Sequence, residues 1–249
     1  MHEIRQEKMN RLIQEREVVT IRELQEIFPE VSLMTIHRDL DLLATKGLIS
    51  KIRGGARSVR HERDLAFEVR ERENLKGKAL VAEKAAGLVR SESCIFLDSG
   101  TTCLTLARLL PESPITVVTT GPNIALALCH TAGPSVTLCP GELNKGNLTV
   151  SGHSTLQFLE TINIDLAFIG VSGYGREEGF TCGKESEMMV KRQVISRARR
   201  TAVLCDQTKF QRLMPFTFAQ IADVDYVISD GALPEELLRV AEDLSVAVL

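Results

Sequence analysis

VSLMTIHRDL, residues 31–40, decides how the first part of this chain folds. Ser32 is a typical helix-start residue, and apolar Ile36, Leu40 and Leu43 follow it at helical spacing. At about 100° per residue, the opposite side carries Met34, His37, Arg38, Asp41 and Thr45, with Thr35 on its flank. The stretch predicts a helix held by one apolar stripe and offering polar groups to solvent, a pattern that an ordinary surface helix shares.

The residues before this helix predict two shorter ones. Thr20 and Glu23 fit a capping box, in which each side chain satisfies a free amide at a helix start. An amphipathic pattern then runs over residues 21–28 and is stopped by Pro29. Apolar residues within 9–13 mark a helix farther upstream.

The residues after it predict a β-hairpin. A strand-like run covers residues 49–53, Gly54-Gly55 makes a tight turn, and residues 56–59 return. Three helices followed by a basic hairpin describe a winged helix-turn-helix. Such a unit places its third helix in the major groove of DNA, where side chains meet base edges.

The motif Thr35-Ile36-His37-Arg38-Asp39-Leu40, with Leu43, Gly47-Leu48 and Gly54-Gly55, resembles the DNA-binding signature of DeoR-type bacterial transcription regulators. His37 stands where that signature normally has arginine, so it lacks the fixed charge and forked geometry of the usual residue. The resemblance implies contacts with a double-stranded DNA operator. The predicted contact residues are Ser32, Met34, Thr35, His37 and Arg38 on the helix, and Lys51, Arg53, Gly54, Gly55 and Arg57 on the hairpin.

Length and composition predict a cytoplasmic protein of two domains with no membrane partner. The chain has 249 residues, 44% of them hydrophobic, and no apolar run approaches the roughly 18 residues of a membrane span. Six cysteines and five histidines lie dispersed, without metal-ligand spacing, so we expect reduced cysteines, no metal and no cofactor.

Charge is distributed unevenly along the chain. Residues 1–61 carry a net charge of +2, and the remainder carries −5. A charge of +2 is small for a nucleic-acid binder, although phosphate contacts supply much of the affinity of such proteins. We therefore expect a homo-oligomer, a dimer or tetramer, which would enlarge the DNA-binding surface.

The chain divides into three parts by pattern. Residues 1–60 form the predicted winged helix-turn-helix, 61–78 a charged linker helix, and 79–249 an effector-sensing and oligomerisation domain. Phe67, Arg70, Asn74 and Lys78 also resemble the linker pattern of the family. From residue 79 onward, continuous apolar strands alternate with helices, which predicts an α/β fold with a mostly parallel sheet.

Asp98-Ser99-Gly100-Thr101-Thr102 stands where a buried strand passes into a helix. Gly100 allows a close turn, and the hydroxyl groups lie beside the free amides of the helix start. That arrangement suits a phosphate group. An ordinary strand-to-helix turn capped by threonine explains the same residues.

Further polar residues follow other predicted strands, where ligand sites of parallel sheets form. Together with Asp206-Gln207-Thr208-Lys209-Phe210, they resemble the effector domain of the DeoR family, which implies a pocket for a small phosphorylated sugar on a ribose-5-phosphate-isomerase-like fold. The predicted effector-binding residues are Asp98, Ser99, Gly100, Thr101, Thr102, Thr120, Gly152, Gly173, Lys191, Asp206 and Lys209.

The leading interpretation is a regulator, in particular a repressor of a carbohydrate-metabolism operon that the phosphorylated sugar controls; an activator would use the same residues. One alternative is a sugar-phosphate isomerase or deaminase carrying a DNA-binding domain. Aldose–ketose isomerisation needs a placed carboxylate, and no acid lies in the turn at residues 170–173, where related isomerases have acids. Another alternative is a DNA-binding module that responds to no ligand.

Overall fold

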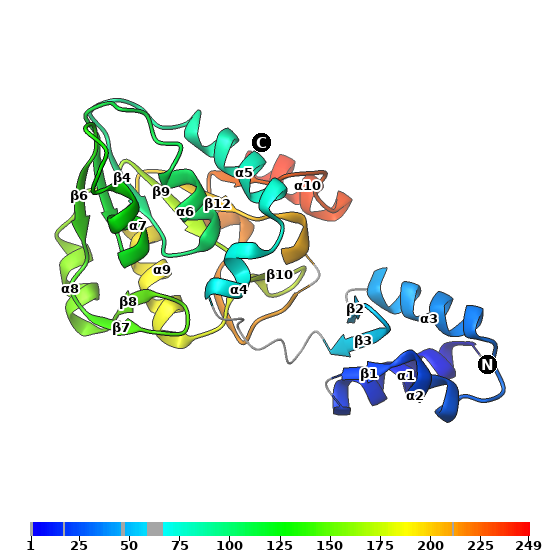
Figure 1. The fold of residues 1–249 in the computed structure, drawn as a ribbon. Helices are drawn as coiled ribbons and strands as arrows, with labels where there is room; N and C mark the ends of the chain where they lie inside the picture. Colours follow the sequence, from blue (N-terminus) through cyan, green and yellow to red (C-terminus); the bar gives the residue numbers. More distant parts are fainter. Residues whose placement is uncertain (1, 17, 46–47, 59–66, 211) are drawn as a thin grey trace.

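A computed structural model describes residues 2–16, 18–45, 48–58, 67–210 and 212–249. Among these residues, the N-terminal unit contains three helices and a three-stranded antiparallel sheet (Figure 1). The helices are α1 (His2–Arg16), α2 (Ile21–Ile27) and α3 (Leu33–Thr45), and the strands are β1 (Val18–Thr20), β2 (Ile49–Ile52) and β3 (Gly55–Ser58). This confirms the winged helix-turn-helix, and it adds strand β1, which the sequence pattern did not predict.

The predicted local signals explain these elements. Thr20 and Glu23 make both hydrogen bonds of the capping box at the start of α2. The predicted apolar stripe of α3 is buried together with Met9 and Ile13 of α1 in one core. Gly54 has a φ of +85°, and a Cβ on Gly55 would lie 2.3 Å from the carbonyl oxygen of Val19. The two glycines therefore allow both the tight turn and the pairing of β3 with β1.

The C-terminal domain is built on a seven-stranded sheet in which every pair of neighbours is parallel. Its order is β15-β14-β12-β9-β4-β5-β6. The strands are β4 (Cys94–Leu97), β5 (Thr116–Thr119), β6 (Ser135–Leu138), β9 (Leu166–Gly170), β12 (Thr201–Leu204), β14 (Tyr226–Ile228) and β15 (Ala247–Val248). The mostly parallel sheet is as predicted, and its central strands are apolar on both sides because helices cover both faces.

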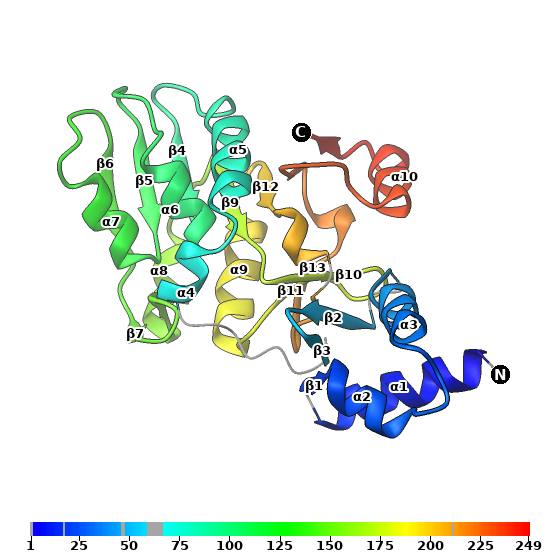
Figure 2. The same cartoon turned by 45° about the vertical axis from the view of Figure 1, so that its right-hand side comes forward.

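Two groups of helices make those two layers (Figure 2). Helices α5 (Leu75–Ala86), α6 (Thr101–Ala107) and α7 (Pro122–Leu128) bury apolar residues with Ile95 and Leu97 on one face. Helices α8 (His153–Glu160), α9 (Glu185–Arg197) and α10 (Glu235–Asp243) do so with Phe96 on the other. Alternate residues of β4 thus enter different cores.

Shorter elements complete the domain. Strands β10 (Gly173–Gly175), β11 (Gly179–Cys182) and β13 (Phe216–Ala219) form a small antiparallel sheet, and β7 (Glu142–Asn144) pairs with β8 (Thr149–Ser151). Two 3₁₀ turns cover Gln207–Lys209 and Ile221–Asp223. The sequence pattern predicted none of these, because three or four residues, several of them glycine or polar, show no clear periodicity.

The expected linker helix over residues 61–78 lies partly outside the described residues, at 61–66. The rest contains α4 (Phe67–Arg72) and the first turn of α5, which begins at Leu75 rather than near residue 79. Within the described part of the chain, no helix has the length and apolar character needed to cross a membrane.

Candidate functional site

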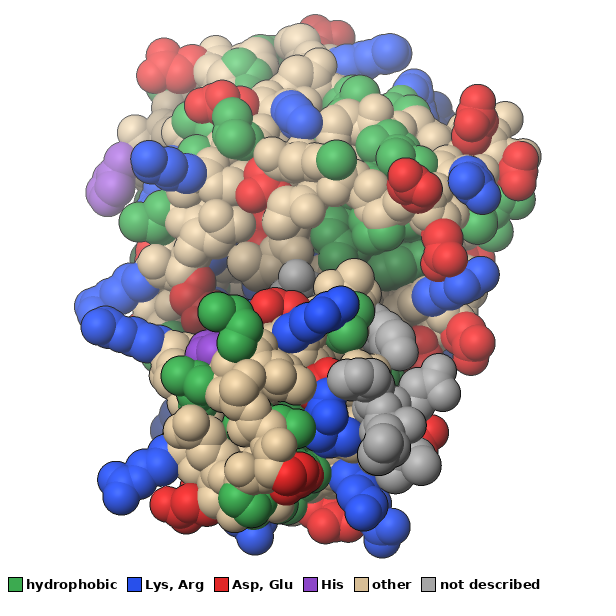
Figure 3. Space-filling model, turned by 90° about the vertical axis from the view of Figure 1, so that its right-hand side faces the viewer, with side chains coloured by type: hydrophobic (Ala, Val, Ile, Leu, Met, Phe, Trp, Pro, Cys, Tyr) green, Lys and Arg blue, Asp and Glu red, His purple; other side chains and the backbone are tan. Residues whose placement is uncertain are grey.

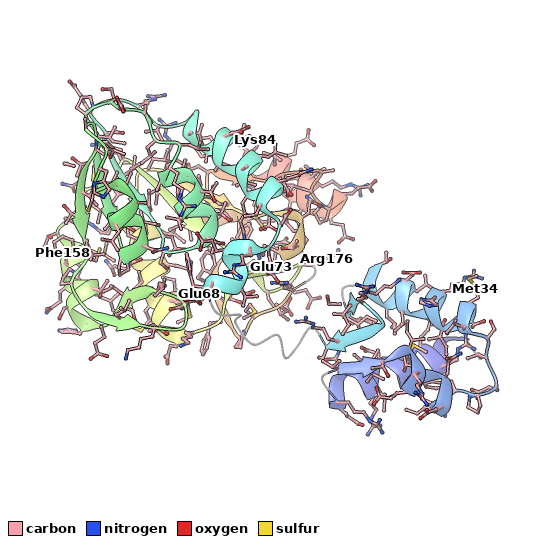
Figure 4. The ribbon with its side chains drawn as sticks, viewed as in Figure 1. Met34, Glu68, Glu73, Lys84, Phe158 and Arg176 are labelled. Atoms are coloured by element: carbon pink, nitrogen blue, oxygen red, sulfur yellow. The ribbon has the colours of Figure 1, made fainter. Side chains whose placement is uncertain are left out.

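The outward side of α3 is arranged as the sequence predicts. The hydroxyl oxygen of Ser32 accepts a hydrogen bond from the backbone N–H of Thr35 at 3.3 Å, which caps the helix start. Met34 is 78% exposed and projects from the outer end of α3 (Figure 4). Arg38 is exposed and His37 is half-buried. These side chains can contact an external partner without rearrangement of the helix.

The inward side of the same motif contains an ion pair that the sequence pattern did not predict. Asp39 is buried and lies 2.6 Å from the guanidinium of Arg5 in α1. The side-chain amide of Gln6 donates to its other carboxylate oxygen at 2.9 Å. The hydrogen bond to Asp39 raises the pKa of Arg5. These contacts attach the inward side of α3 to α1.

The basic residues of the hairpin differ in exposure and in pairing. Arg53 is exposed beside the Gly54 turn, whereas Lys51 pairs with Asp41 of α3. Arg57 lies half-buried in β3, the central strand of the small sheet. Basic and acidic side chains are interspersed over the face seen in Figure 3, in line with the low net charge of this unit.

A pocket in the C-terminal domain lies at the carboxyl ends of β4 and β9. It has a volume of about 650 Å³, including its open mouth. Seven predicted effector residues line it, namely Asp98, Ser99, Gly100, Thr101, Thr102, Lys191 and Lys209. Eight residues outside that prediction also line it, namely Arg70, Thr149, Gly170, Val171, Ser172, Glu187, Arg212 and Met214.

A buried ion pair forms the floor of the pocket. The ammonium of Lys191 contacts the Asp98 carboxylate and donates to the carbonyl of Gly170 at 2.8 Å. The same carboxylate oxygen accepts from the backbone N–H of Gly170 at 3.0 Å. Burial is the largest influence and opposes the charge on Lys191, but the Asp98 carboxylate, Cys182 and Glu187 together raise the lysine pKa. Lys191, which the sequence suggests as a phosphate contact, is therefore bound to Asp98 in this structure.

Hydroxyl groups surround the turn that follows β4. Ser99, Thr101 and Thr102 are almost fully buried at its start, and the Ser99 hydroxyl hydrogen-bonds the hydroxyl of Thr149 from β8. Gly100 stands at the N-cap of α6 and has no side chain to cap the first turn. The turn thus combines small side chains, hydroxyl groups and backbone amides on one wall of the pocket.

Lys209 supplies a second buried ammonium. Its nitrogen lies 3.8 Å from a carboxylate oxygen of Asp206, whose other oxygen accepts from the N–H of Thr208 at 3.0 Å. Burial lowers the pKa of Lys209. Burial alone would raise the pKa of Asp206, but the Lys209 ammonium and the hydrogen bonds from Thr208 and Asn74 together hold it below its usual value. Asp206 lies behind Lys209 and does not itself line the pocket.

Two arginines enter the pocket wall from segments that sequence reasoning did not connect with it. Arg70 comes from α4, and Arg212 follows the 3₁₀ turn that carries Lys209. Arg212 lies 4.0 Å from Glu73. A Cβ on Gly173 would lie 2.4 Å from the carbonyl oxygen of Arg212, so this glycine permits the close approach. Only the family-like linker pattern singled out Arg70.

Three further predicted residues do not line the pocket. Gly173 supports Arg212 from behind, as described. Gly152 lies exposed at the start of α8 with a φ of +118°. Thr120 is buried at the end of β5, and its hydroxyl has no hydrogen-bond partner among the described residues.

Comparison with known protein families identifies both parts of the chain. Residues 5–62 match the DeoR-like helix-turn-helix domain. Residues 73–231 match the DeoR C-terminal sensor domain. The two matches together include the helix α3, the hairpin and the pocket-forming turn after β4.

Curated relatives align over nearly the full length. The HTH-type transcriptional regulator GolR of Listeria innocua is 31% identical over 98% of this chain and 96% of its own. The glycerol-3-phosphate regulon repressor of Escherichia coli is 30% identical over 93% of this chain and 92% of its own. These names support the prediction of a regulator rather than an enzyme.

Solved structures that match part of this chain include ribose-5-phosphate isomerase A of Methanocaldococcus jannaschii, with 19% identity and a TM-score of 0.39 over 53% of this chain and 52% of that one. The probable sor operon regulator of Shigella flexneri has 10% identity and a TM-score of 0.42 over 63% and 86%. The family matches and the full-length relatives decide the assignment: this chain belongs to the DeoR family of DNA-binding transcription regulators.

Proposed function

We propose that this regulator represses a carbohydrate-metabolism operon and that a small phosphorylated sugar controls its affinity for DNA. The observation that carries the proposal is the pocket wall on which Ser99, Thr101 and Thr102 share one recess with Lys209 and Arg212. Hydroxyl groups, backbone amides and cations are the groups that bind phosphate. The name of the Escherichia coli relative, a glycerol-3-phosphate regulon repressor, supports the same ligand class.

We propose a division of labour along the chain. The operator is bound by residues 1–60. The effect of the metabolite is transmitted by residues 61–78, and the metabolite is sensed by residues 79–249, which also hold the oligomer together. The helix residues Ser32, Met34, Thr35, His37 and Arg38 contact the major groove, and Lys51, Arg53 and Arg57 at the Gly54-Gly55 hairpin contact the adjacent backbone. The turn 98–102 and Lys209 hold the phosphate, while Lys191 positions Asp98 beneath it.

Regulation follows from linkage between the two sites. A ligand that binds one arrangement of the chain more tightly than another shifts the population toward the first. The DNA affinity then changes by the difference in binding free energy, typically about 1–3 kcal/mol, or about 5- to 150-fold. Repression with relief by the metabolite requires that the ligand favour the arrangement with the lower operator affinity.

The test is fluorescence anisotropy of the full chain with DNA from around its own gene, at two salt concentrations. It is repeated with glycerol-3-phosphate, ribose-5-phosphate, other sugar phosphates and their unphosphorylated parents. We expect salt-sensitive binding that one phosphorylated compound weakens and its parent does not. Specific binding that no phosphate alters would favour a ligand-independent module, and enhancement would indicate the opposite sign of control.

Two substitutions separate the sites. Arg38→Ala should lower operator affinity by about 1–3 kcal/mol, the contribution of a good base-edge contact, and leave metabolite binding unchanged. Thr101→Glu should abolish metabolite binding by repulsion of the phosphate and leave operator binding intact. Thr105→Glu is the matched control, because Thr105 lies one turn farther along α6 and does not line the pocket. Loss of both functions in a folded variant would contradict the two-site assignment.

A further inference from the structure

Helix α4 is the first described element after the segment that joins it to the winged helix-turn-helix. Its first residue, Phe67, is buried in the core beneath α5 and α6, and its N–H donates to the carbonyl of Gly146 at 2.9 Å. Glu71 pairs with Arg108 at the end of α6 at 3.3 Å. The helix is therefore attached to the sensor domain along its length.

The other end of α4 is held by a buried lysine. The ammonium of Lys78 donates to the carbonyl of Glu73 at 2.6 Å and also to that of Arg70. These carbonyl groups belong to the last turn of α4 and the residue just beyond it, near Glu73 in Figure 4. A cation at this position satisfies free carbonyl groups and matches the negative end of the helix.

Arg70 extends this attachment into the ligand pocket. It is half-buried, its guanidinium lies 5.9 Å from the centre of the Phe67 ring, and it lines the same recess as Lys209 and Arg212. The charges affect one another. Burial and then the nearby Lys209 lower the pKa of Lys78 to about 8. Burial lowers the pKa of Lys209, Asp206 and Glu73 oppose this, and Arg212 and Arg70 add to it.

Arg70, Lys209 and Arg212 line one opening, with Asp206 beside Lys209 and Glu73 beside Arg212. An anion bound at the turn 98–102 would be attracted by Arg70 as well as by Lys209 and Arg212, so it would draw α4 toward the pocket wall. The same helix continues directly into the segment leading to the DNA-binding unit. Ligand binding and the position of that segment would then be energetically linked.

We propose that Arg70 is the residue through which a bound phosphate group acts on α4, and so on the linker to the DNA-binding unit. The proposal rests on the proposed function and names its regulatory step. Ligand affinity comes mainly from the turn 98–102 and Lys209, whereas the response of the linker comes from Arg70. Arg70→Gln should therefore separate binding from response.

The experiment is hydrogen–deuterium exchange on the full chain, with inorganic phosphate as the probe and chloride at equal ionic strength as the reference. In the wild type, we expect phosphate to slow exchange several-fold at the turn 98–102 and also in α4. In Arg70→Gln, protection of the turn should remain and protection of α4 should be lost. Arg72→Gln is the matched control, because Arg72 lies on the same helix, is exposed and does not line the pocket.

The outcomes distinguish this proposal from the function on which it rests. Phosphate-dependent protection of α4 that persists in Arg70→Gln would overturn the role of Arg70, as would equal losses in the Arg70 and Arg72 variants. Protection of the wild-type turn without protection of α4 would also overturn it while leaving the phosphate site in place. No protection at either segment of the wild type would overturn the phosphate site and this proposal together.

Discussion

The two domains use charged side chains in opposite ways. On α3, Arg38 is exposed, and the buried Asp39 next to it is paired with Arg5 of α1. In the sensor pocket, Lys191 and Lys209 are themselves buried, each beside an aspartate. The first arrangement suits a large external partner whose own charges pair with the exposed cation at the surface. The second suits a small anion that must be drawn out of water.

The difference shows where a charged side chain affects the stability of the fold. An exposed cation keeps most of its hydration and contributes little to the stability of the fold. A buried cation has lost that hydration, so the fold depends on its partner remaining in place. Removal of an exposed cation such as Arg38 should therefore act mainly on binding, whereas removal of the buried partner of an aspartate, such as Lys191, should act mainly on stability.

The largest expected effect is on the buried floor of the pocket. Lys191→Met leaves the Asp98 carboxylate buried without its cation and should lower the free energy of unfolding of the sensor domain by about 3–5 kcal/mol. Arg38→Met should change stability by no more than about 0.5 kcal/mol. Urea denaturation followed by tyrosine fluorescence measures the sensor domain alone, because the chain has no Trp and both tyrosines, Tyr174 and Tyr226, lie there.

A second variant tests whether the loss comes from the unpaired charge. Asp98→Asn combined with Lys191→Met removes both charges and should recover part of the lost stability, since no isolated carboxylate remains. The stability of Arg38→Met is measured by urea denaturation followed by circular dichroism. If Lys191→Met lowered the free energy of unfolding no more than Arg38→Met does, the contrast between the two domains would fail.

An intermediate effect is expected from pH on the affinity for inorganic phosphate. Burial lowers the pKa of Lys209, so its ammonium loses charge at a lower pH than an ordinary lysine. A bound anion favours the charged form, and affinity should fall as pH rises from about 8 toward about 10, where phosphate is already doubly charged, by up to about tenfold for each unit by which binding raises that pKa. Isothermal titration calorimetry across this range measures the fall.

Lys209→Arg is the control for that titration, because arginine keeps its charge throughout this range. Its affinity for phosphate should vary less with pH between about 8 and 10 than that of the wild type. A wild-type affinity that stayed constant over the same range would show that Lys209 does not contribute its charge to the site.

The smallest effect is expected on the exposed helix. His37→Arg restores the residue usual in the family and should add about one phosphate contact. The plot of log affinity for DNA against log salt concentration should steepen by about 0.9. Anisotropy titrations at several salt concentrations measure the slope, and the binding of inorganic phosphate to the sensor domain should be unaffected. An unchanged slope would mean that position 37 does not reach the DNA backbone.

Local patterns were sufficient to predict most of the fold. The helix spacing of residues 33–45, the capping box at Thr20 and the apolar run of β4 each specify their element through neighbours in the chain. Short strands such as β1 and β10 escaped prediction, because they exist by pairing with partners distant in sequence.

The candidate site was predicted only in part for the same reason. The turn 98–102 and Lys209 carry their own signals, and the structure brings them into one pocket. Arg70 and Thr149 reach it only through folding, since one lies on α4 and the other on a short hairpin. Lys191 reaches it too, but its pairing with Asp98, 93 residues away in sequence, is visible only in three dimensions.

The close approach of Gly55 to the carbonyl of Val19 has a consequence for genetics. Any side chain at this position would push β3 away from β1 and so displace the hairpin. A random-mutagenesis screen for lost operator binding should therefore recover substitutions at Gly55 alongside those at Arg38. The two classes would share a phenotype but not a cause, and a suppressor that restores the strand pairing could rescue only the first.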